Sequence, residues 1–346
     1  MINKILEEEY NLIYSGLVLE LNKLKNRNIL ITGATGLVGS YLVDFLDYLN
    51  KNYNLGIKIY AMARSRERLI NKFGEENLNL IYLEQDLNLP IKDSSLKYDY
   101  IIHAASNAHP VAYSTDPVGT MKTNLLGTMN LLELLRISQG KFLYISTGEI
   151  YGNNTDHAFK EEDLGVVDTK QVRACYPESK RAAETLCMAY AAQYGINLNV
   201  ARLCYVYGAT ITDTNSRADA QFLRNALDKK DIVMKSEGTQ KRTYCYVADV
   251  LSGLLCILLK GQNNEVYNVS NPNSIVSIKE YAQTLADIAG VQLKFELPDE
   301  IEARGFSKPL DSILDSTKLQ NIGWRPIYDI KSGLTNTVKQ LLLRES

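Results

Sequence analysis

Tyr176 and Lys180 stand four residues apart at the start of a predicted helix. On a helix this spacing places both side chains on one face, so that a phenol and an ammonium group can reach the same cleft. A free tyrosine has a pKa near ~10, and a cation beside it favours the phenolate. The pair predicts acid/base chemistry on an alcohol or a ketone. Because this spacing also occurs in helices by chance, the surrounding elements must decide.

The composition is typical of a soluble globular protein with one large or two unequal domains. The chain has 346 residues, of which 45% are hydrophobic, and its net charge of -2 gives no sign of a nucleic-acid partner or a basic membrane anchor. Its five cysteines form no C-x-x-C pair, which suits reduced thiols in the cytoplasm. With three histidines and no Cys/His cluster, we expect no metal site. His103 lies in an apolar run and is predicted to be a core residue.

The beginning of the chain predicts an amphipathic helix and no export signal. Glu7, Glu8 and Glu9 interrupt the position where a signal peptide needs its apolar core, and no run reaches transmembrane length. Between Ile5 and Leu24 the apolar residues recur at three- and four-residue intervals. We expect this extension, residues 1–27, to pack on the fold or on a second subunit.

Residues 28–49 have the pattern of a dinucleotide-binding unit. A strand at Asn28–Thr32 leads directly into Gly33-Ala-Thr-Gly-Leu-Val-Gly39, and an amphipathic helix follows from Ser40 to Leu49. The first glycine makes the turn, the second lets backbone approach a pyrophosphate, and the third lets the helix pack on the strand. The N-H groups and positive dipole end of the helix would then bind the phosphates.

The end of the second strand, Ile57–Ala63, indicates the cofactor. An acidic residue there would bind the ribose of NAD, but the chain reads Met62-Ala-Arg-Ser-Arg66. Arg64 can face the 2'-phosphate of NADP, so we expect NAD or NADP with a preference for NADP. The alternative is a solvated Arg64 that only stacks on adenine.

Strands and helices continue to alternate, which predicts a parallel, doubly wound Rossmann-type α/β sheet over residues 28–208. The third and fourth strands are expected at Leu80–Leu83 and Tyr100–Ser106, and a long helix at Asp116–Ile137 precedes the fifth strand, Lys141–Ser146. Thr147 and Glu149 follow this fifth strand directly. Since ligands bind beyond the carboxyl ends of such strands, these two side chains are placed for chemistry on a substrate oxygen and a carbon-bound proton.

Taken in order, these motifs resemble the extended short-chain dehydrogenase/reductase family, in the branch that modifies nucleotide sugars. The resemblance covers the chain from about Asn28 to Trp324. Its motifs are Gly33-x-x-Gly-x-x-Gly39, Asp86, His103-Ala-Ala105, Asn124, Ser146-Thr-Gly-Glu-Ile-Tyr-Gly152, Tyr176-x-x-x-Lys180 and Ala201-Arg-Leu-Cys-Tyr-Val-Tyr-Gly208.

The resemblance implies a role for each site residue. Tyr176 would take the proton of a sugar hydroxyl while hydride passes to the nicotinamide. Lys180 would hold the nicotinamide ribose and lower the tyrosine pKa, Thr147 would bond the reacting oxygen, and Glu149 would act as base. The expected cofactor contacts are Gly33, Thr35, Gly36, Leu37, Val38, Gly39, Arg64, Ser65, Asp86, Leu87, Ala104, Ala105, Ser106 and Asn124.

Residues 209–346 are expected to form mainly a smaller α/β substrate region, with some segments returning to the Rossmann domain. Arg217 and Arg242 are phosphate-binding candidates, because a guanidinium group can meet two phosphate oxygens at once. Tyr205 and Gln221 are further candidates for substrate contact. The resemblance implies a nucleotide-diphosphate sugar as substrate, and a homodimer formed through the helices near Val118–Ile137 and after Tyr176.

The sequence around Tyr176 is most similar to UDP-glucuronate decarboxylases, in which a C4 ketone allows loss of carbon dioxide. Two positions depart from that pattern: Tyr205 replaces the usual Asn, and Ser312 replaces an arginine. A cation for the sugar carboxylate would then come from Arg304 or Lys308.

The sequence leaves three other functions open. A 4,6-dehydratase would keep Glu149 as base but has Gly148 at the position of its usual acid, whereas an epimerase needs neither group. A cofactor-sensing protein without catalysis would typically have lost Tyr176 or Lys180, which this chain retains.

Overall fold

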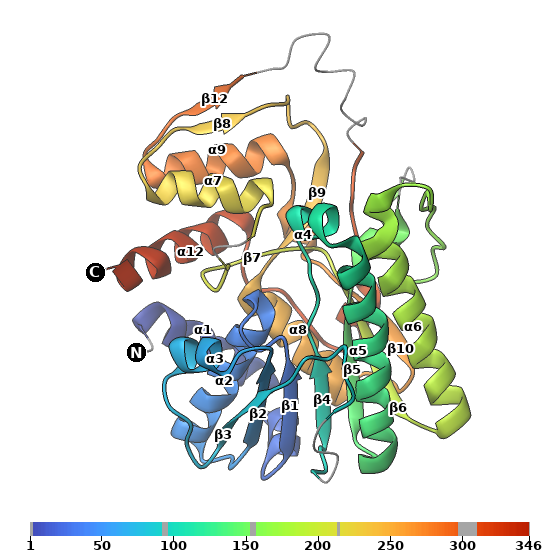
Figure 1. Ribbon diagram of the computed structural model, residues 1–346. Coiled ribbons are helices and arrows are strands. Elements are labelled where there is room, and N and C mark those ends of the chain that lie inside the picture. Colours follow the sequence, from blue (N-terminus) through green and yellow to red (C-terminus); the bar gives the residue numbers. More distant parts are fainter. Residues whose placement is uncertain (1–2, 92–95, 153–156, 213–214, 297–309, 346) are drawn as a thin grey trace.

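The computed structural model describes residues 3–91, 96–152, 157–212, 215–296 and 310–345. Its centre is a seven-stranded sheet in which every pairing is parallel and whose order is β10-β6-β5-β4-β1-β2-β3 (Figure 1). The strands are β1 Asn28–Thr32, β2 Lys58–Ala63, β3 Leu80–Glu84, β4 Tyr100–His103, β5 Lys141–Thr147, β6 Asn197–Leu203 and β10 Glu265–Val269. The predicted fold class is confirmed.

Both faces of this sheet are covered, which explains why its strands read as apolar runs. In β1, Ile29 and Ile31 belong to the core on one face, while Leu30 belongs to the core on the other. The first face carries α1 Lys4–Leu21 with η1 Asn22–Leu24, α2 Leu37–Tyr53, α3 Arg66–Phe73 and α8 Val247–Lys260. The second face carries α5 Pro117–Ser138 and α6 Cys175–Tyr194, which pack side by side (Figure 1).

The short helices between these layers surround the carboxyl ends of the strands. They are α4 Pro110–Thr115, η2 Gly148–Tyr151 and η3 Val172–Ala174. The helix after the glycine turn begins at Leu37, three residues earlier than predicted, because Gly36 takes the N-cap position. The fourth strand ends at His103 instead of Ser106, which leaves residues 104–106 as open backbone beside the glycine turn.

A second, smaller group of elements lies above the carboxyl ends of the strands (Figure 1). Strands β7 Tyr205–Tyr207, β9 Lys241–Tyr246 and β11 Ile275–Ser277 form one sheet, and β8 Ile232–Met234 pairs with β12 Leu293–Phe295. Its helices are α7 Ala218–Leu227, α9 Ile278–Ala289 and α12 Ile330–Glu345, while η4 Pro272–Ser274 and α11 Thr317–Asn321 connect it to β10. The chain returns from this region to the main sheet through α8 and β10.

The N-terminal helix α1 packs on the fold itself. Glu9 is buried with the apolar residues of this helix and is 1% exposed. Its carboxylate accepts hydrogen bonds from Tyr41 of α2 at 2.7 Å and from Tyr246 of β9 at 2.6 Å. Asn336 and Gln340 of α12 donate to the same carboxylate at 2.9 and 3.0 Å. Glu9 therefore connects α2, on the first face of the main sheet, to β9 and α12 in the smaller group of elements. Among the described residues, no helix combines the length and the apolar character required to cross a membrane.

Candidate active site

The glycine turn forms a cradle that side chains would fill. Gly33 has φ +66°, and a Cβ atom there would lie 2.7 Å from the backbone N of Ala105. A Cβ on Gly39 would lie 2.2 Å from the carbonyl oxygen of Gly33, so glycine lets α2 approach β1 closely. The first-turn N-H groups of α2 begin at Leu37, beside this open backbone. The residues present therefore fit the pyrophosphate of a dinucleotide.

A cavity of about 180 Å³ continues from this cradle past the ends of β2 and β3. Arg64 lines both this cavity and the central one, and no hydrogen bond or ion pair of its guanidinium occurs within the described ranges. Ser65 caps α3 by accepting from the backbone N of Arg68 at 3.2 Å. The predicted residues that line this cavity are Gly33, Thr35, Gly36, Arg64, Ser65, Asp86, Leu87, Ala104, Ala105 and Ser106. Its position and lining suit the adenosine half of the cofactor.

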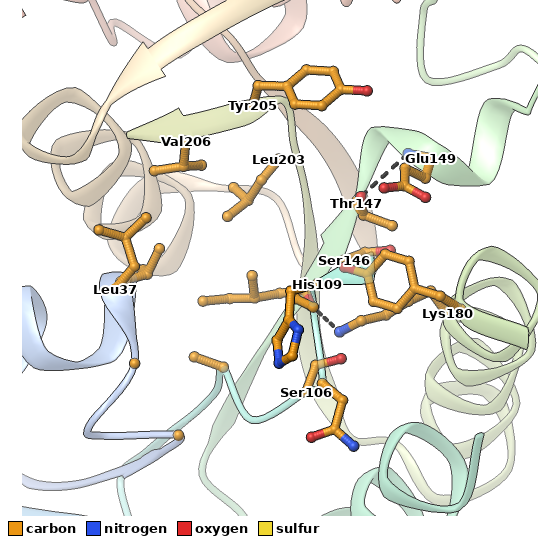
Figure 2. Close-up of a pocket in the computed structure, with 18 of the residues that line it drawn as sticks. Leu37, Ser106, His109, Ser146, Thr147, Glu149, Lys180, Leu203, Tyr205 and Val206 are labelled. Carbon is orange, nitrogen blue, oxygen red and sulfur yellow. Dashed lines mark hydrogen bonds between the residues drawn. The ribbon is translucent and has the colours of Figure 1, made fainter. Parts of the chain in front are cut away.

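A central cavity of about 320 Å³ holds all four predicted catalytic side chains, of which Figure 2 labels Thr147, Glu149 and Lys180. Tyr176 and Lys180 reach it from the first turns of α6, and Thr147 and Glu149 reach it from the end of β5. Leu37, Val38 and Gly39 line the opposite wall. The structure thus brings together the phenol, the ammonium, the hydroxyl and the carboxylate beside the cofactor cradle.

Burial, rather than the lysine, dominates the electrostatics of Tyr176. Burial and the charge of Glu149 raise the pKa of its phenol, while a hydrogen bond with Thr147 and the charges of Arg217 and Arg173 lower it. The prediction of a lowered pKa for Tyr176 is wrong for the protein alone. The physical reason is that the phenol is 6% exposed and that the Lys180 ammonium is bonded elsewhere.

Lys180 lies one turn after Tyr176 on α6, and other groups hold its ammonium. Its Nζ donates to the carbonyl oxygen of Ile145 at 2.8 Å (Figure 2) and lies 4.8 Å from the ring centroid of Tyr144. Burial lowers the pKa of Lys180 to about 7, although the nearby Glu184 carboxylate raises it. An ammonium group that loses its proton near neutral pH can exchange protons with a substrate site.

Asn124 differs from the other predicted cofactor contacts, because it does not line any of these cavities. It is fully buried between α5 and α6. Its Oδ1 accepts from Ser106 Oγ at 2.8 Å, and its Nδ2 donates to Ser179 Oγ at 2.9 Å. Asn124 therefore connects the loop after β4 to the helix that carries Tyr176.

The four predicted substrate residues gather at an outer cavity of about 660 Å³. Tyr205 lines both the outer and the central cavity, and the guanidinium of Arg242 lies 4.4 Å from the centroid of its ring. The Nε of Arg242 is buried without a hydrogen-bond partner among the described residues. The backbone N of Arg217 donates to Asn215 Oδ1 at 3.1 Å, and Gln221 lies one turn further along α7. Two guanidinium groups at one cavity suit a diphosphate.

Sequence reasoning missed two neighbours of Tyr176. The ring of Tyr113 from α4 stacks on the Tyr176 ring, with 4.8 Å between centroids and 26° between planes. The guanidinium of Arg173 lies 4.3 Å from the Tyr113 centroid and 2.5 Å from Glu149 Oε2. Tyr113 is more than sixty positions before Tyr176 in the chain, and no local pattern connects the two.

Ser312 stands where the resemblance led us to expect an arginine, and the structure places it at the site. Ser312 pairs with Arg242 through an isolated bridge and lines the central cavity. Arg304 and Lys308 lie outside the described residues. No cluster of three His, Cys, Asp or Glu side chains that could hold a metal occurs in the described part of the chain.

The model of the NAD dependent epimerase/dehydratase family matches residues 29–270. The chain belongs to this family. UDP-glucuronic acid decarboxylase 5 of Arabidopsis thaliana is 33% identical over 324 residues, which cover 92% of this chain and 90% of that relative. UDP-glucuronic acid decarboxylase 1 of Xenopus tropicalis is 31% identical over 92% of this chain and 73% of its own length.

Solved structures of the epimerase/dehydratase family have the same fold. The UDP-glucose 4-epimerase of Thermotoga maritima, solved with UDP-glucose, aligns with a TM-score of 0.76 and 25% identity over 92% of this chain and 100% of that one. A dTDP-glucose 4,6-dehydratase of Bacillus anthracis, solved with NAD, aligns with a TM-score of 0.75 and 22% identity over 92% of this chain and 97% of that one. The resemblance found in the sequence is confirmed as to family and fold.

Proposed function

We propose that this protein oxidises the C4 hydroxyl of a nucleotide sugar with a bound nicotinamide cofactor and that it then decarboxylates a UDP-glucuronate-like substrate. One observation carries the first step: Tyr176, Thr147 and Lys180 meet in a cavity walled by the glycine turn. The relatives named UDP-glucuronic acid decarboxylase support the second step. The epimerase solved with UDP-glucose supports a UDP-sugar as ligand.

The side chains divide the proposed reaction among them. Tyr176 takes the proton of the C4 hydroxyl, and Thr147, which shares a hydrogen bond with the phenol, orients the reacting oxygen. Lys180 lies beneath them and exchanges the proton. When bound, the nicotinamide supplies a hydride acceptor that returns the same hydride later. The C4 ketone makes the carboxylate on C5 part of a β-keto acid, which loses carbon dioxide, and a proton then takes its place at C5.

The dinucleotide cofactor and the nucleotide sugar would enter the central cavity from opposite ends. The glycine turn, with Asp86 and Arg64, would hold the dinucleotide, whereas Arg217, Gln221 and Arg242 would hold the nucleotide diphosphate. Epimerisation is the second candidate, because Ser312 at the central cavity supplies no cation for a sugar carboxylate. Dehydration is less well supported, since Gly148 leaves the position of its usual acid without a functional group.

A panel of nucleotide sugars tests the proposal. The protein is incubated with NAD or NADP and with UDP-, GDP-, CDP- and dTDP-sugars, and the products are weighed by mass spectrometry. We expect UDP-glucuronate to lose the mass of carbon dioxide, and Tyr176→Phe to abolish the loss. An unchanged mass with altered stereochemistry would establish the epimerase. Binding of the sugars without any chemistry would indicate a sensing protein and would overturn the enzymatic proposal.

We further propose a preference for NADP over NAD. Arg64 lies at the cavity where a 2'-phosphate would enter, without an ion-pair partner among the described residues, and Arg68 lines the same cavity. A calorimetric titration should give tighter binding of NADP, and Arg64→Ala should remove the difference. Equal or tighter binding of NAD by the unaltered protein would refute this preference.

We also propose a homodimer formed through α5 and α6, in a protein that works in the cytoplasm. Val118 and Ile137 on α5 are 62% and 56% exposed, and Met121 and Met129 continue the apolar stripe between them. The five cysteines are free, which agrees with a reducing compartment. Sedimentation should give a dimer that Met121→Asp dissociates; a monomeric unaltered protein would contradict the proposal.

A further inference from the structure

Tyr113 and Arg173 form a stack on Tyr176 that the proposed chemistry does not yet use. The order of the stack is the guanidinium of Arg173, the ring of Tyr113 and the ring of Tyr176, with 4.3 Å from guanidinium to ring and 4.8 Å between the ring centroids. Tyr113 is 3% exposed, so the middle of the stack is shielded from water. A cation over an aromatic face and two stacked rings are both attractive arrangements.

The stack closes into a ring through the two residues at the end of β5. Arg173 donates to Glu149 Oε2 at 2.5 Å, and the backbone N of Glu149 donates to Thr147 Oγ1 at 3.2 Å. The Thr147 hydroxyl in turn lies close enough to the phenol of Tyr176 to lower its pKa. Each member of the ring therefore restrains the next, and the restraint acts on the phenol of Tyr176 and on the carboxylate of Glu149, the predicted base.

We infer that Arg173 and Tyr113 are positioning residues that together hold the phenol of Tyr176 and the carboxylate of Glu149 in their reacting geometry. This inference rests on the proposed function. Arg173 acts through Glu149 and Tyr113, since it lines the outer cavity without reaching the central one. Tyr113 reaches both cavities and supplies the surface on which the Tyr176 ring rests.

The charged groups around Tyr176 set the pKa of its phenol, so a pH profile can test the inference. Glu149 from η2 raises the pKa of the phenol, whereas Arg173 before α6 and Arg217 before α7 lower it. The neutral groups that face it are Thr147 of β5 and the phenol of Tyr113, and Lys180 lies one turn further along α6. Removing Arg173 deletes a cation and leaves Glu149 unpaired. Both changes disfavour the phenolate.

The test compares the pH dependence of C4 oxidation in variants of the full chain. Release of carbon dioxide from UDP-glucuronate gives kcat, because the proposed cycle returns the hydride and leaves no net reduced nicotinamide. The transient reduced nicotinamide is followed by absorbance within a single turnover. Arg173→Gln should move the acid limb of the kcat profile upward by about one pH unit, which corresponds to about a tenfold loss of rate below the limb. KM should rise as well, because Arg173 lines the outer cavity proposed for the nucleotide diphosphate, but a binding role alone would leave the limb in place. Arg173→Lys should restore part of the rate. The double variant with Glu149→Gln should return the limb toward its original position.

Arg136 provides a matched control outside the site. It also pairs with a glutamate, Glu133 at 3.0 Å, and lies 5.3 Å from the centroid of a tyrosine ring, that of Tyr194. Arg136→Gln should leave the profile unchanged. An unmoved limb in Arg173→Gln, or an effect on KM alone, would overturn the inference.

Urea unfolding separates this inference from the proposed function. Arg173→Gln and Tyr113→Leu should be non-additive, because each breaks the same stack. Additive shifts would show that the stack is not a unit and would overturn the inference even in an inactive protein. Failure to form transient reduced nicotinamide in a single turnover, together with no product from any nucleotide sugar, would instead refute the proposed function, and with it the catalytic purpose of the stack.

Discussion

Removing the Glu9 carboxylate should destabilise the whole protein. Glu9 is 1% exposed and accepts hydrogen bonds from Tyr41, Tyr246, Asn336 and Gln340, which belong to three different elements. In Glu9→Ala all four donors lose their buried acceptor. Its neighbour Glu8 has a side chain that is 64% exposed and only a 4.0 Å contact with Lys4, so Glu8→Ala is a matched control.

The size of the effect follows from the four donors. Gln340 keeps a second acceptor, the hydroxyl of Tyr246 at 3.2 Å, so that three of the four donors are left without a partner. A buried donor without a partner costs about 1–3 kcal/mol, and three of them at the lower end give about 3 kcal/mol. Since native proteins are stable by roughly 5–15 kcal/mol, this is a large part of the total. For Glu8→Ala we expect less than about 1 kcal/mol, as for other exposed ion pairs.

Urea unfolding followed by tryptophan fluorescence measures both variants. The chain has a single tryptophan, Trp324, which is 3% exposed and donates from Nε1 to Ser252 Oγ at 2.9 Å. Its emission therefore reports loss of the α8 environment. A Glu9→Ala protein within about 1 kcal/mol of the unaltered one would refute the role assigned to Glu9.

Two further perturbations test the cofactor cradle and the buried lysine. Gly39→Ala would place a methyl group 2.2 Å from the Gly33 carbonyl oxygen and should abolish nucleotide binding in a titration, whereas Gly16→Ala, with no atom within 4 Å of the new Cβ, should bind normally; equal binding by both would contradict the cradle. Burial lowers the pKa of Lys180 to about 7, so between that pH and the unfolded value near ~10.4 the unfolded chain binds more protons and stability rises with pH. Lys180→Met should remove this contribution, which urea unfolding at about pH 7 and about pH 9 measures; an identical slope in both proteins would show that Lys180 is not perturbed.

Local sequence patterns were sufficient to predict the strand, turn and helix that form the glycine cradle. The strand, glycine turn and helix at residues 28–53 are contiguous, and the turn needs glycine for reasons that one segment contains. Tyr176 and Lys180 were equally readable, because one helix carries both. The same reading gave the wrong direction for the Tyr176 pKa, since burial depends on how other elements cover the ring.

Contacts between distant segments could not be read from the sequence. Tyr113 meets Tyr176 because α4 packs beside η3, which directly precedes α6, and Glu9 meets Gln340 because α1 and α12 are brought together from opposite ends of the chain. Asn124 was predicted from its motif as a cofactor contact, which stays a prediction, whereas its bonds to Ser106 and Ser179 became visible only in the structure. Such roles follow from packing, not from periodicity.

Transfer of deuterium at the sugar C4 position tests the central claim most directly. The protein is incubated with UDP-glucuronate carrying deuterium at C4, and both the reduced nicotinamide and the product are observed. If Tyr176 initiates oxidation at C4 and the same hydride returns, reduced nicotinamide must form transiently and the product must retain the deuterium. A product that has lost the label to solvent, or one formed without any reduced nicotinamide, would contradict this account.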